Sequence, residues 1–159
     1  MNGRLLGLLA CLVVIPWSAP TAQCSRGTLT GEVTYVRDGD TIELGEMAIR
    51  LQGLAAPEWN EPGGTEARQA MIELVHGRTV RCALDGTRTY DRCAGICYLD
   101  GADISEVMVR RGVASDCRRY SGGRYPEAER RAAPDGATVG RTYPLPGRAR
   151  RTANSSLVP

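Results

Sequence analysis

Acidic and basic side chains meet at close spacing in three short stretches of the chain. These are residues 36–41 (Val-Arg-Asp-Gly-Asp-Thr), residues 49–58 (Ile-Arg-Leu-Gln-Gly-Leu-Ala-Ala-Pro-Glu) and residues 90–92 (Tyr-Asp-Arg). Carboxylates bind hard cations and accept protons, and an arginine offers a planar fork of donors to oxyanions. Taken singly, each stretch has a structural interpretation: an Asx turn, a solvated strand residue at Arg50, and a loop start at Pro57. Only the three stretches together indicate a site that binds cations and oxyanions and transfers protons.

Positive charge in this chain comes from arginine alone, because lysine is absent. Residues 24–133 hold 15 Arg against 17 Asp and Glu, a net of −2, whereas residues 134–159 hold four Arg and one Asp. The first segment therefore has no bulk positive potential with which to attract a polyanion. Any recognition of phosphate must come from a few placed arginines, whose forks match phosphate oxygens.

Alternating apolar residues and turn signals predict five strands, at 31–37, 41–44, 47–51, 78–84 and 93–99. Gly45-Glu46 would form the tight hairpin between the second and third strands. Helical spacing of apolar residues predicts a helix over 65–76. A second helix would begin at Asp103, with Glu106 completing a capping box, and end at Gly112. A more polar third helix would span 125–132.

This order of elements is typical of one particular fold. Three consecutive strands, a helix, two more strands and further helices match a five-stranded OB-fold Greek-key barrel. The fold class is therefore α+β and mainly β, with about three helices. Other small α+β arrangements remain compatible with the pattern alone.

The three stretches, in this order, resemble the staphylococcal-nuclease-like family. That family pairs an Asp-Gly-Asp-Thr turn with an Arg-Leu strand running to Pro-Glu, followed later by Tyr-Gly-Arg. The resemblance covers residues 29–131 and includes Leu-Asp-Gly at 99–101, Val-Arg-Arg-Gly-Val-Ala at 109–114 and Tyr-Ser-Gly-Gly-Arg-Tyr at 120–125. It implies the OB-fold barrel and hydrolysis of phosphodiester bonds in DNA or RNA.

The resemblance also implies roles for individual residues. Arg50 and Arg92 match the family's phosphate-binding arginines, which would meet the negative charge that builds on phosphate and leaving oxygens. Glu58 matches the carboxylate that acts on the attacking water as a general base. Tyr90 and Tyr120 would stack on or border a base, or else pack at the mouth of the barrel.

A calcium ion is the cofactor that the resemblance implies. Asp40 matches a direct ligand, the carbonyl of Ala56 would supply a further oxygen, and Asp38 would hold a metal-bound water. Ala55 stands where the family commonly has a second ligand Asp, so the expected site is weakened unless Glu61 or additional water fills the gap. Asp91 replaces the glycine before the second arginine. These departures leave two alternatives open: a barrel that binds nucleic acid without cutting it, and an interaction domain without nucleic acid.

The first 23 residues have the pattern of a secretory signal peptide. Arg4 precedes an apolar run from Leu5 to Trp17, which is too short to span a bilayer comfortably; the alternative is a buried first helix. The chain then divides into a leader (1–23), a nuclease-like domain (24–133) and a loose tail (134–159) rich in Pro, Gly and Arg. We expect a periplasmic or secreted monomer without a membrane anchor after leader cleavage.

Removal of such a leader would leave five cysteines, an odd number. An oxidising compartment then favours two disulfides and one leftover thiol, for which Cys24 is the candidate. Zinc is disfavoured because only Cys93 and Cys97 are closely spaced and the single histidine, His76, lies elsewhere. On the barrel implied by the resemblance, we expect the pairs Cys82–Cys97 and Cys93–Cys117.

Overall fold

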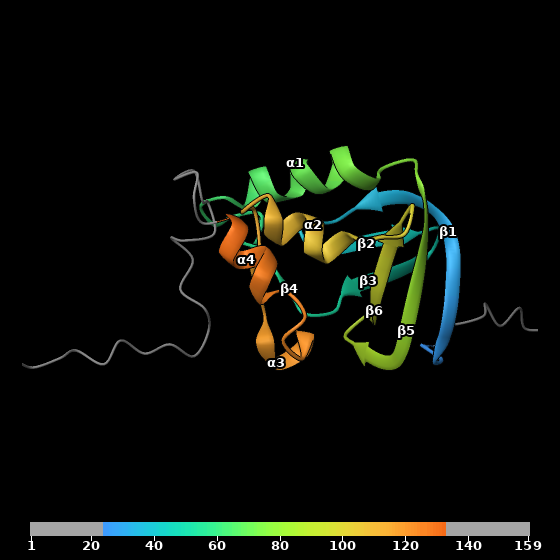
Figure 1. Ribbon diagram of the computed structural model, residues 1–159. Helices are drawn as coiled ribbons and strands as arrows, with labels where there is room; N and C mark the ends of the chain where they lie inside the picture. Colours follow the sequence, from blue (N-terminus) through green and yellow to red (C-terminus); the bar gives the residue numbers. More distant parts are fainter. Residues whose placement is uncertain (1–23, 133–159) are drawn as a thin grey trace, which may run out of the picture.

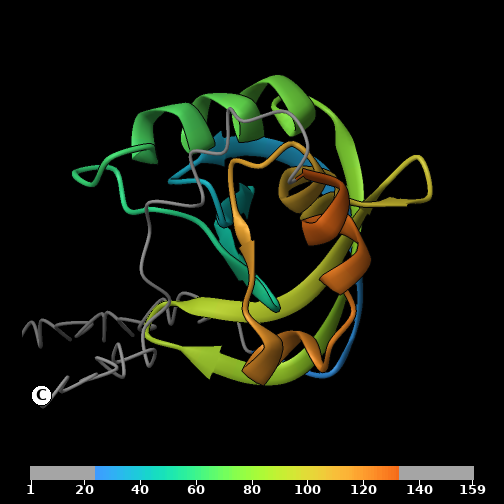
Figure 2. The same cartoon turned by 60° about the vertical axis from the view of Figure 1, so that its left-hand side comes forward.

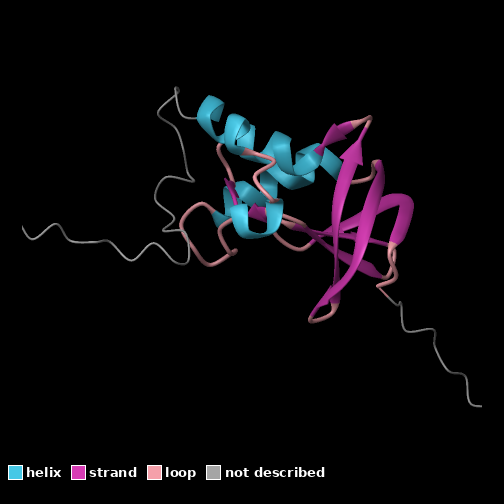
Figure 3. Ribbon diagram, turned by 60° about the horizontal axis from the view of Figure 1, so that its bottom comes forward, coloured by secondary structure: helices cyan, strands magenta, loops and turns pink. Residues whose placement is uncertain are grey.

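A computed structural model describes residues 24–132 of the chain. The expected leader and tail lie outside the described residues. A closed barrel of five strands forms one side of the molecule, and the helices gather on the other side (Figures 1 and 3). The five strands are β1 Gly27–Val36, β2 Thr41–Leu44, β3 Met47–Leu51, β5 Thr79–Thr89 and β6 Arg92–Leu99.

Antiparallel ladders connect these strands in the order β3-β2-β1-β5-β6, and a parallel pairing of β3 with β6 closes the barrel. This is the mainly β, α+β fold with an OB-type barrel that the sequence predicts. The β2–β3 hairpin turns at Gly45, whose φ of 60° lies in the left-handed region that glycine adopts without strain. Parallel closure joins two strands that are far apart in sequence, and it determines the geometry of the site described below.

Four helices lie to one side of the barrel (Figure 1): α1 Gly64–Val75, α2 Ile104–Arg110, α3 Arg118–Ser121 and α4 Pro126–Ala132. The Asp103 carboxylate caps α2 by accepting from the backbone N–H groups of Ser105 (2.9 Å) and Glu106 (3.3 Å). Glu106 pairs with Arg110 one turn later, so the expected capping box is not formed. Among the described residues, no helix combines the length and apolar character needed to cross a membrane.

Three short strands and one helix were not predicted. β4 Leu54–Ala55 pairs with β8 Ser115–Asp116, and β7 Ala102–Asp103 pairs with the end of β6. Two-residue strands are too short to show an alternating pattern. The four-residue helix α3 is likewise shorter than one apolar repeat, and strands β1 and β5 are longer than predicted.

One continuous apolar core fills the barrel and the space under the helices. Strand residues such as Val33, Ile42 and Ile49 meet Met71 of α1 and Met108 of α2, and all five side chains are fully buried. Close packing of this kind fixes the strand register, because a slip by one residue would move the apolar set to the outside.

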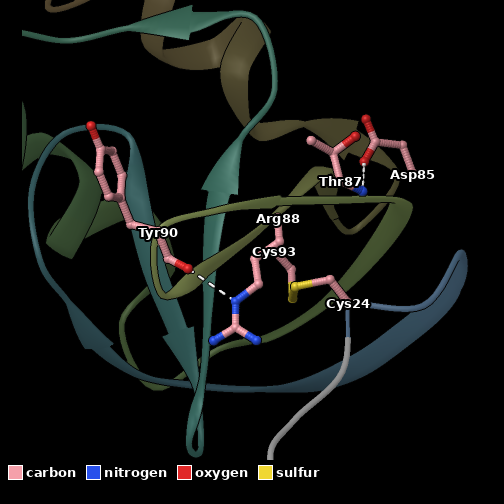
Figure 4. Close-up of a disulfide and its surroundings, with 6 residues drawn as sticks. All are labelled: Cys24, Asp85, Thr87, Arg88, Tyr90 and Cys93. Carbon is pink, nitrogen blue, oxygen red and sulfur yellow. Dashed lines mark hydrogen bonds between the residues drawn. A yellow bond between two sulfur atoms is a disulfide. The ribbon is translucent and has the colours of Figure 1, made fainter.

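Two disulfides cross-link the described domain, and one differs from the prediction. Cys82 pairs with Cys97 between neighbouring positions of β5 and β6, as expected. The pair Cys93–Cys117 is wrong: Cys93 is joined to Cys24, with 5.3 Å between Cα atoms (Figure 4). Strand β1 starts four residues earlier than predicted, and its ladder with β5 carries Cys24 to the β5–β6 end of the barrel. The expectation that Cys24 is the leftover thiol is therefore also wrong: among the described cysteines, Cys117 is the one without a disulfide.

Candidate active site

The two site arginines lie on one face of the sheet because β3 and β6 pair in parallel. In this register Ala48 lies opposite Arg92, and Arg50 lies opposite Ala94. Side chains two residues apart along a strand point to the same face, so Arg50 and Arg92 project together. The parallel pairing thus places two guanidinium groups, 42 positions apart in sequence, at one end of the barrel.

Asp40 and Thr41 link these arginines into one hydrogen-bonded chain. Arg92 donates from Nη1 to the Thr41 hydroxyl (3.1 Å), and that hydroxyl donates to Oδ1 of Asp40 (3.1 Å). The other carboxylate oxygen of Asp40 forms an ion pair with Arg50. Asp40 is only 5% exposed, so the pairing satisfies a carboxylate that would otherwise be costly to bury.

The turn before β2 holds Asp40 in this position. Oδ1 of Asp38 accepts from the backbone N–H of Asp40 at 2.9 Å, which forms the expected Asx turn. A Cβ at Gly39 would lie 2.6 Å from Cβ of Ala56 and 2.8 Å from Cβ of Ala67, so only glycine lets the turn approach α1 this closely. The N–H of Ala56 points to Oδ2 of Asp40 at 3.4 Å.

Glu58 lies on the loop between β4 and α1, with its side chain exposed to solvent. Its charge acts on Arg50 across the site. Burial lowers the pKa of Arg50 below its ordinary value, the charge of Arg92 lowers it further, and the charges of Asp38 and Glu58 oppose these effects. Arg50 therefore lies in the electrostatic field of Asp38, Glu58 and Arg92, in addition to its ion pair with Asp40.

Tyr90 and Tyr120 both lie on the surface. Tyr90 is 87% exposed in the β5–β6 turn, and the Arg92 guanidinium lies 6.0 Å from the centre of its ring. Tyr120 is 59% exposed on α3, with Arg119 at 5.5 Å. Neither ring packs into the core, so both are available for contact with a ligand.

Asp91, the residue before Arg92, pairs its carboxylate with Arg37. Its Oδ2 accepts from Nη1 of Arg37 at 2.5 Å, and the same guanidinium also binds Glu43. The Arg37 hydrogen bond lowers the pKa of Asp91. The departure from the family's glycine is therefore balanced by Arg37, a residue of the first motif to which the sequence analysis gave no role. Thr41 is a second such residue.

The oxygen atoms near Asp40 are of the type that binds calcium, but few of them come from side chains. Carboxylates at Asp40 and Asp38 and the nearby backbone carbonyls are hard oxygens of the type that calcium prefers, usually about six to eight at a time. Within residues 24–132, no group of three or more His, Cys, Asp or Glu side chains is arranged to hold a metal. Ala55 contributes a methyl group, and Glu61 accepts from the Glu58 N–H at 2.8 Å. Water and substrate oxygens would have to complete the coordination.

Comparison with known proteins identifies the family of the chain. The model of the family "Staphylococcal nuclease homologue" matches residues 48–137. A probable staphylococcal-like nuclease of Oryza sativa subsp. japonica is 34% identical over 76 residues, which make up 48% of this chain and 23% of that protein. An uncharacterized endonuclease of Haemophilus influenzae is 30% identical over 103 residues, 62% of this chain and 58% of that protein.

A succinoglycan biosynthesis protein of Rhizobium meliloti is 28% identical over 153 residues, which make up 89% of this chain and 78% of that protein. The chain spans less than two thirds of the length of the rice and Haemophilus relatives. Since the family model matches more than half of its residues, the chain belongs to the family of staphylococcal nuclease homologues.

Proposed function

We propose that this domain is a nuclease that hydrolyses phosphodiester bonds in DNA or RNA. The observation that carries the proposal is the joint projection of Arg50 and Arg92 beside Asp40, with Glu58 within electrostatic reach of Arg50. Family membership and relatives named as endonucleases support the same reaction class.

The residues divide the reaction between them. Arg50 and Arg92 bind the non-bridging oxygens of the scissile phosphate and stabilise the charge that develops on them. Glu58 accepts a proton from the attacking water as its oxygen bonds to phosphorus. The bond from phosphorus to the leaving oxygen breaks, and that oxygen takes a proton from solvent. Arg92, held through Thr41, remains in place throughout.

Calcium is the proposed cofactor, at a weakened site. Asp40 would bind it directly, the carbonyl of Ala56 would add an oxygen, and Asp38 would act through a bound water. A divalent cation supplies positive charge that polarises the phosphate. Arg50 forms an ion pair with Asp40, so a calcium ion would share that carboxylate with Arg50.

We propose that the protein is exported from the cytoplasm. Two disulfides are typical of proteins that fold in an oxidising compartment. We propose that residues 1–23 direct export and that the remaining chain acts as a periplasmic or secreted monomer.

A second candidate function is nucleic-acid binding without cleavage. Ala55 favours it, because a methyl group cannot replace a metal-binding carboxylate. Incubating the full chain with single-stranded DNA or RNA, with and without calcium, separates the two. Cleavage supports the nuclease, binding without cleavage supports the second candidate, and the absence of both overturns both.

A further inference from the structure

The turn between β5 and β6 carries Arg92 at its end. Thr89 pairs with Arg92 across this hairpin, which leaves Tyr90 and Asp91 as the turn residues. Tyr90 has a φ of 57°, in the left-handed region that a bulky residue adopts only at an energetic cost. Figure 2 shows the turn projecting from the barrel away from α1 and α2. Contacts with neighbouring parts of the barrel must therefore hold the turn in place.

Asp91 is attached to the first motif through Arg37, which directly follows β1. Nη1 of Arg37 donates to Oδ2 of Asp91 at 2.5 Å, and Nε of Arg37 donates to Oε1 of Glu43 on β2 at 2.5 Å. The carbonyl of Arg37 accepts from Nε of Arg68 on α1 at 3.1 Å, so its backbone is held as well. Two carboxylates thus fix the orientation of one planar guanidinium group.

Consecutive residues of the turn bind residues that meet across the motif. The N–H of Arg37 donates to the carbonyl of Thr41 at 3.0 Å, which closes the motif into a loop. Asp91 binds Arg37, and Arg92 binds the hydroxyl of Thr41. A hydrogen bond at the tip of the long Arg92 side chain does not by itself fix the backbone that carries it. The Asp91 contact supplies a second point of attachment, one residue away.

This attachment orients the turn more than it stabilises the fold. The Asp91 side chain is 61% exposed, and exposed ion pairs contribute little to the free energy of unfolding. Placement matters far more for catalysis, because a displacement of about 1 Å at a reacting centre can cost about 10²-fold in rate. The charge of Arg37 is compensated by Glu43 and Asp91, so this guanidinium is satisfied without a substrate phosphate.

We infer that Arg37 and Asp91 are positioning residues, whose ion pair holds the β5–β6 turn against the first motif and so aims Arg92 at the scissile phosphate before substrate binds. Glu43 orients Arg37 for this contact. The inference rests on the proposed function, and it assigns a use to Asp91, which stands where the family commonly has glycine.

Backbone dynamics of the free protein test the attachment without a nuclease assay. We expect NMR order parameters of about 0.85 for the amides of residues 90–92 in the full chain, and values below about 0.6 in Arg37→Ala and Asp91→Ala. Arg78→Ala is the matched control, because it removes the arginine of another exposed ion pair, with Asp100 beyond the far end of β6. Order parameters near 0.85 in both site variants would overturn the inference.

Steady-state kinetics on a single-stranded oligonucleotide test the consequence for catalysis. Arg37→Ala and Asp91→Ala should each lower kcat about ten- to 100-fold and change KM by less than about twofold, because only the aim of Arg92 is lost. The double variant should be no slower than either single variant, since both remove the same ion pair. Asp91→Glu keeps the carboxylate and should recover most of kcat, and Arg78→Ala should retain the parental kcat.

The kinetic outcomes separate this inference from the function on which it rests. Parental kcat in both site variants would overturn the inference and leave the proposed function intact. A loss confined to Arg37→Ala would do the same, because it would show that Arg37 binds phosphate directly. Failure of the parent to cut any nucleic acid would overturn both.

Discussion

Arg92 donates from Nη1 to the hydroxyl of Thr41 at 3.1 Å, and that hydroxyl connects it to Asp40 and Arg50. Arg50 and Arg92 come from β3 and β6, the strands whose parallel pairing closes the barrel, while Thr41 begins β2 and Asp40 lies in the turn before it. Closure of the barrel therefore places the two arginines side by side, because they lie on the two strands that pair to close it.

Removal of Arg50 should reduce stability as well as activity. In Arg50→Ala the buried carboxylate of Asp40 keeps its hydrogen bonds from Thr41 and Ala56 but loses its cation. We expect a loss of about 1–3 kcal/mol in the free energy of unfolding, measured by urea denaturation. Adding Asp40→Asn should recover part of that stability without restoring cleavage. An Arg50→Ala variant as stable as the parent would show that the ion pair is not needed.

The disulfides predict a specific chemical pattern. Peptide mapping of protein folded by export should find Cys24 linked to Cys93, Cys82 linked to Cys97, and Cys117 as a titratable thiol. Loss of either bridge should lower the free energy of unfolding by about 2–5 kcal/mol. Cys24→Ser with Cys93→Ser tests the first bridge, and Cys82→Ala with Cys97→Ala is the comparison. A Cys93–Cys117 peptide would contradict this pairing.

The ion pair of Asp91 with Arg37 should make stability depend on acid pH. Arg37 lowers the pKa of Asp91 in the folded state. Its stabilisation is therefore present above the ordinary pKa of an unfolded aspartate, about 3.9, and is lost as pH falls through the lower folded value. Asp91→Asn should make the thermal midpoint fall less between about pH 5 and pH 2.

Arg37→Gln should likewise reduce the fall of the thermal midpoint at acid pH, because it removes the other partner of the ion pair. Thermal melts of the parent and both variants over that range provide the measurement. If the two variants and the parent lose stability in parallel on acidification, the pair has no role in the pH dependence.

Much of this architecture follows from patterns of apolar residues and turn signals. Strands β2 and β3 begin and end at their predicted residues, because Gly45 marks the hairpin between two clear alternations. The partner of Cys93 was mispredicted as Cys117. The early residues of β1, Gly27 to Thr30, show little alternation of apolar and polar residues, so the sequence did not reveal that Cys24 lies beside Cys93. Thr41 and Arg37 both belong to the first motif. Their partners, Arg92 and Asp91, come close only through strand pairing, which the sequence alone does not reveal.

Ala55 provides the test of the proposed calcium site. Ala55→Asp adds a carboxylate at the position where the family commonly has one, and hard cations gain affinity with ligand charge. We expect cleavage by this variant to saturate at a calcium concentration about tenfold lower than in the parent. This corresponds to a gain of about 1.4 kcal/mol in the free energy of calcium binding. Ala55→Asn is the matched control, with similar size but no charge. An unchanged calcium dependence in Ala55→Asp would contradict the proposed site.

The central claim is that Arg50, Arg92 and Glu58 together hydrolyse phosphodiester bonds. Initial rates of cleavage of a labelled single-stranded oligonucleotide should be measured for the full chain, Glu58→Gln and Arg92→Ala, with Arg110→Gln as control, because Arg110 pairs with Glu106 on the surface of α2. We predict cleavage by the parent and the control, and a fall of about 10²–10⁴-fold in both site variants while thermal midpoints remain near that of the parent. Cleavage at parental rates by Glu58→Gln or Arg92→Ala, or no cleavage by the parent under any calcium concentration, would contradict the claim.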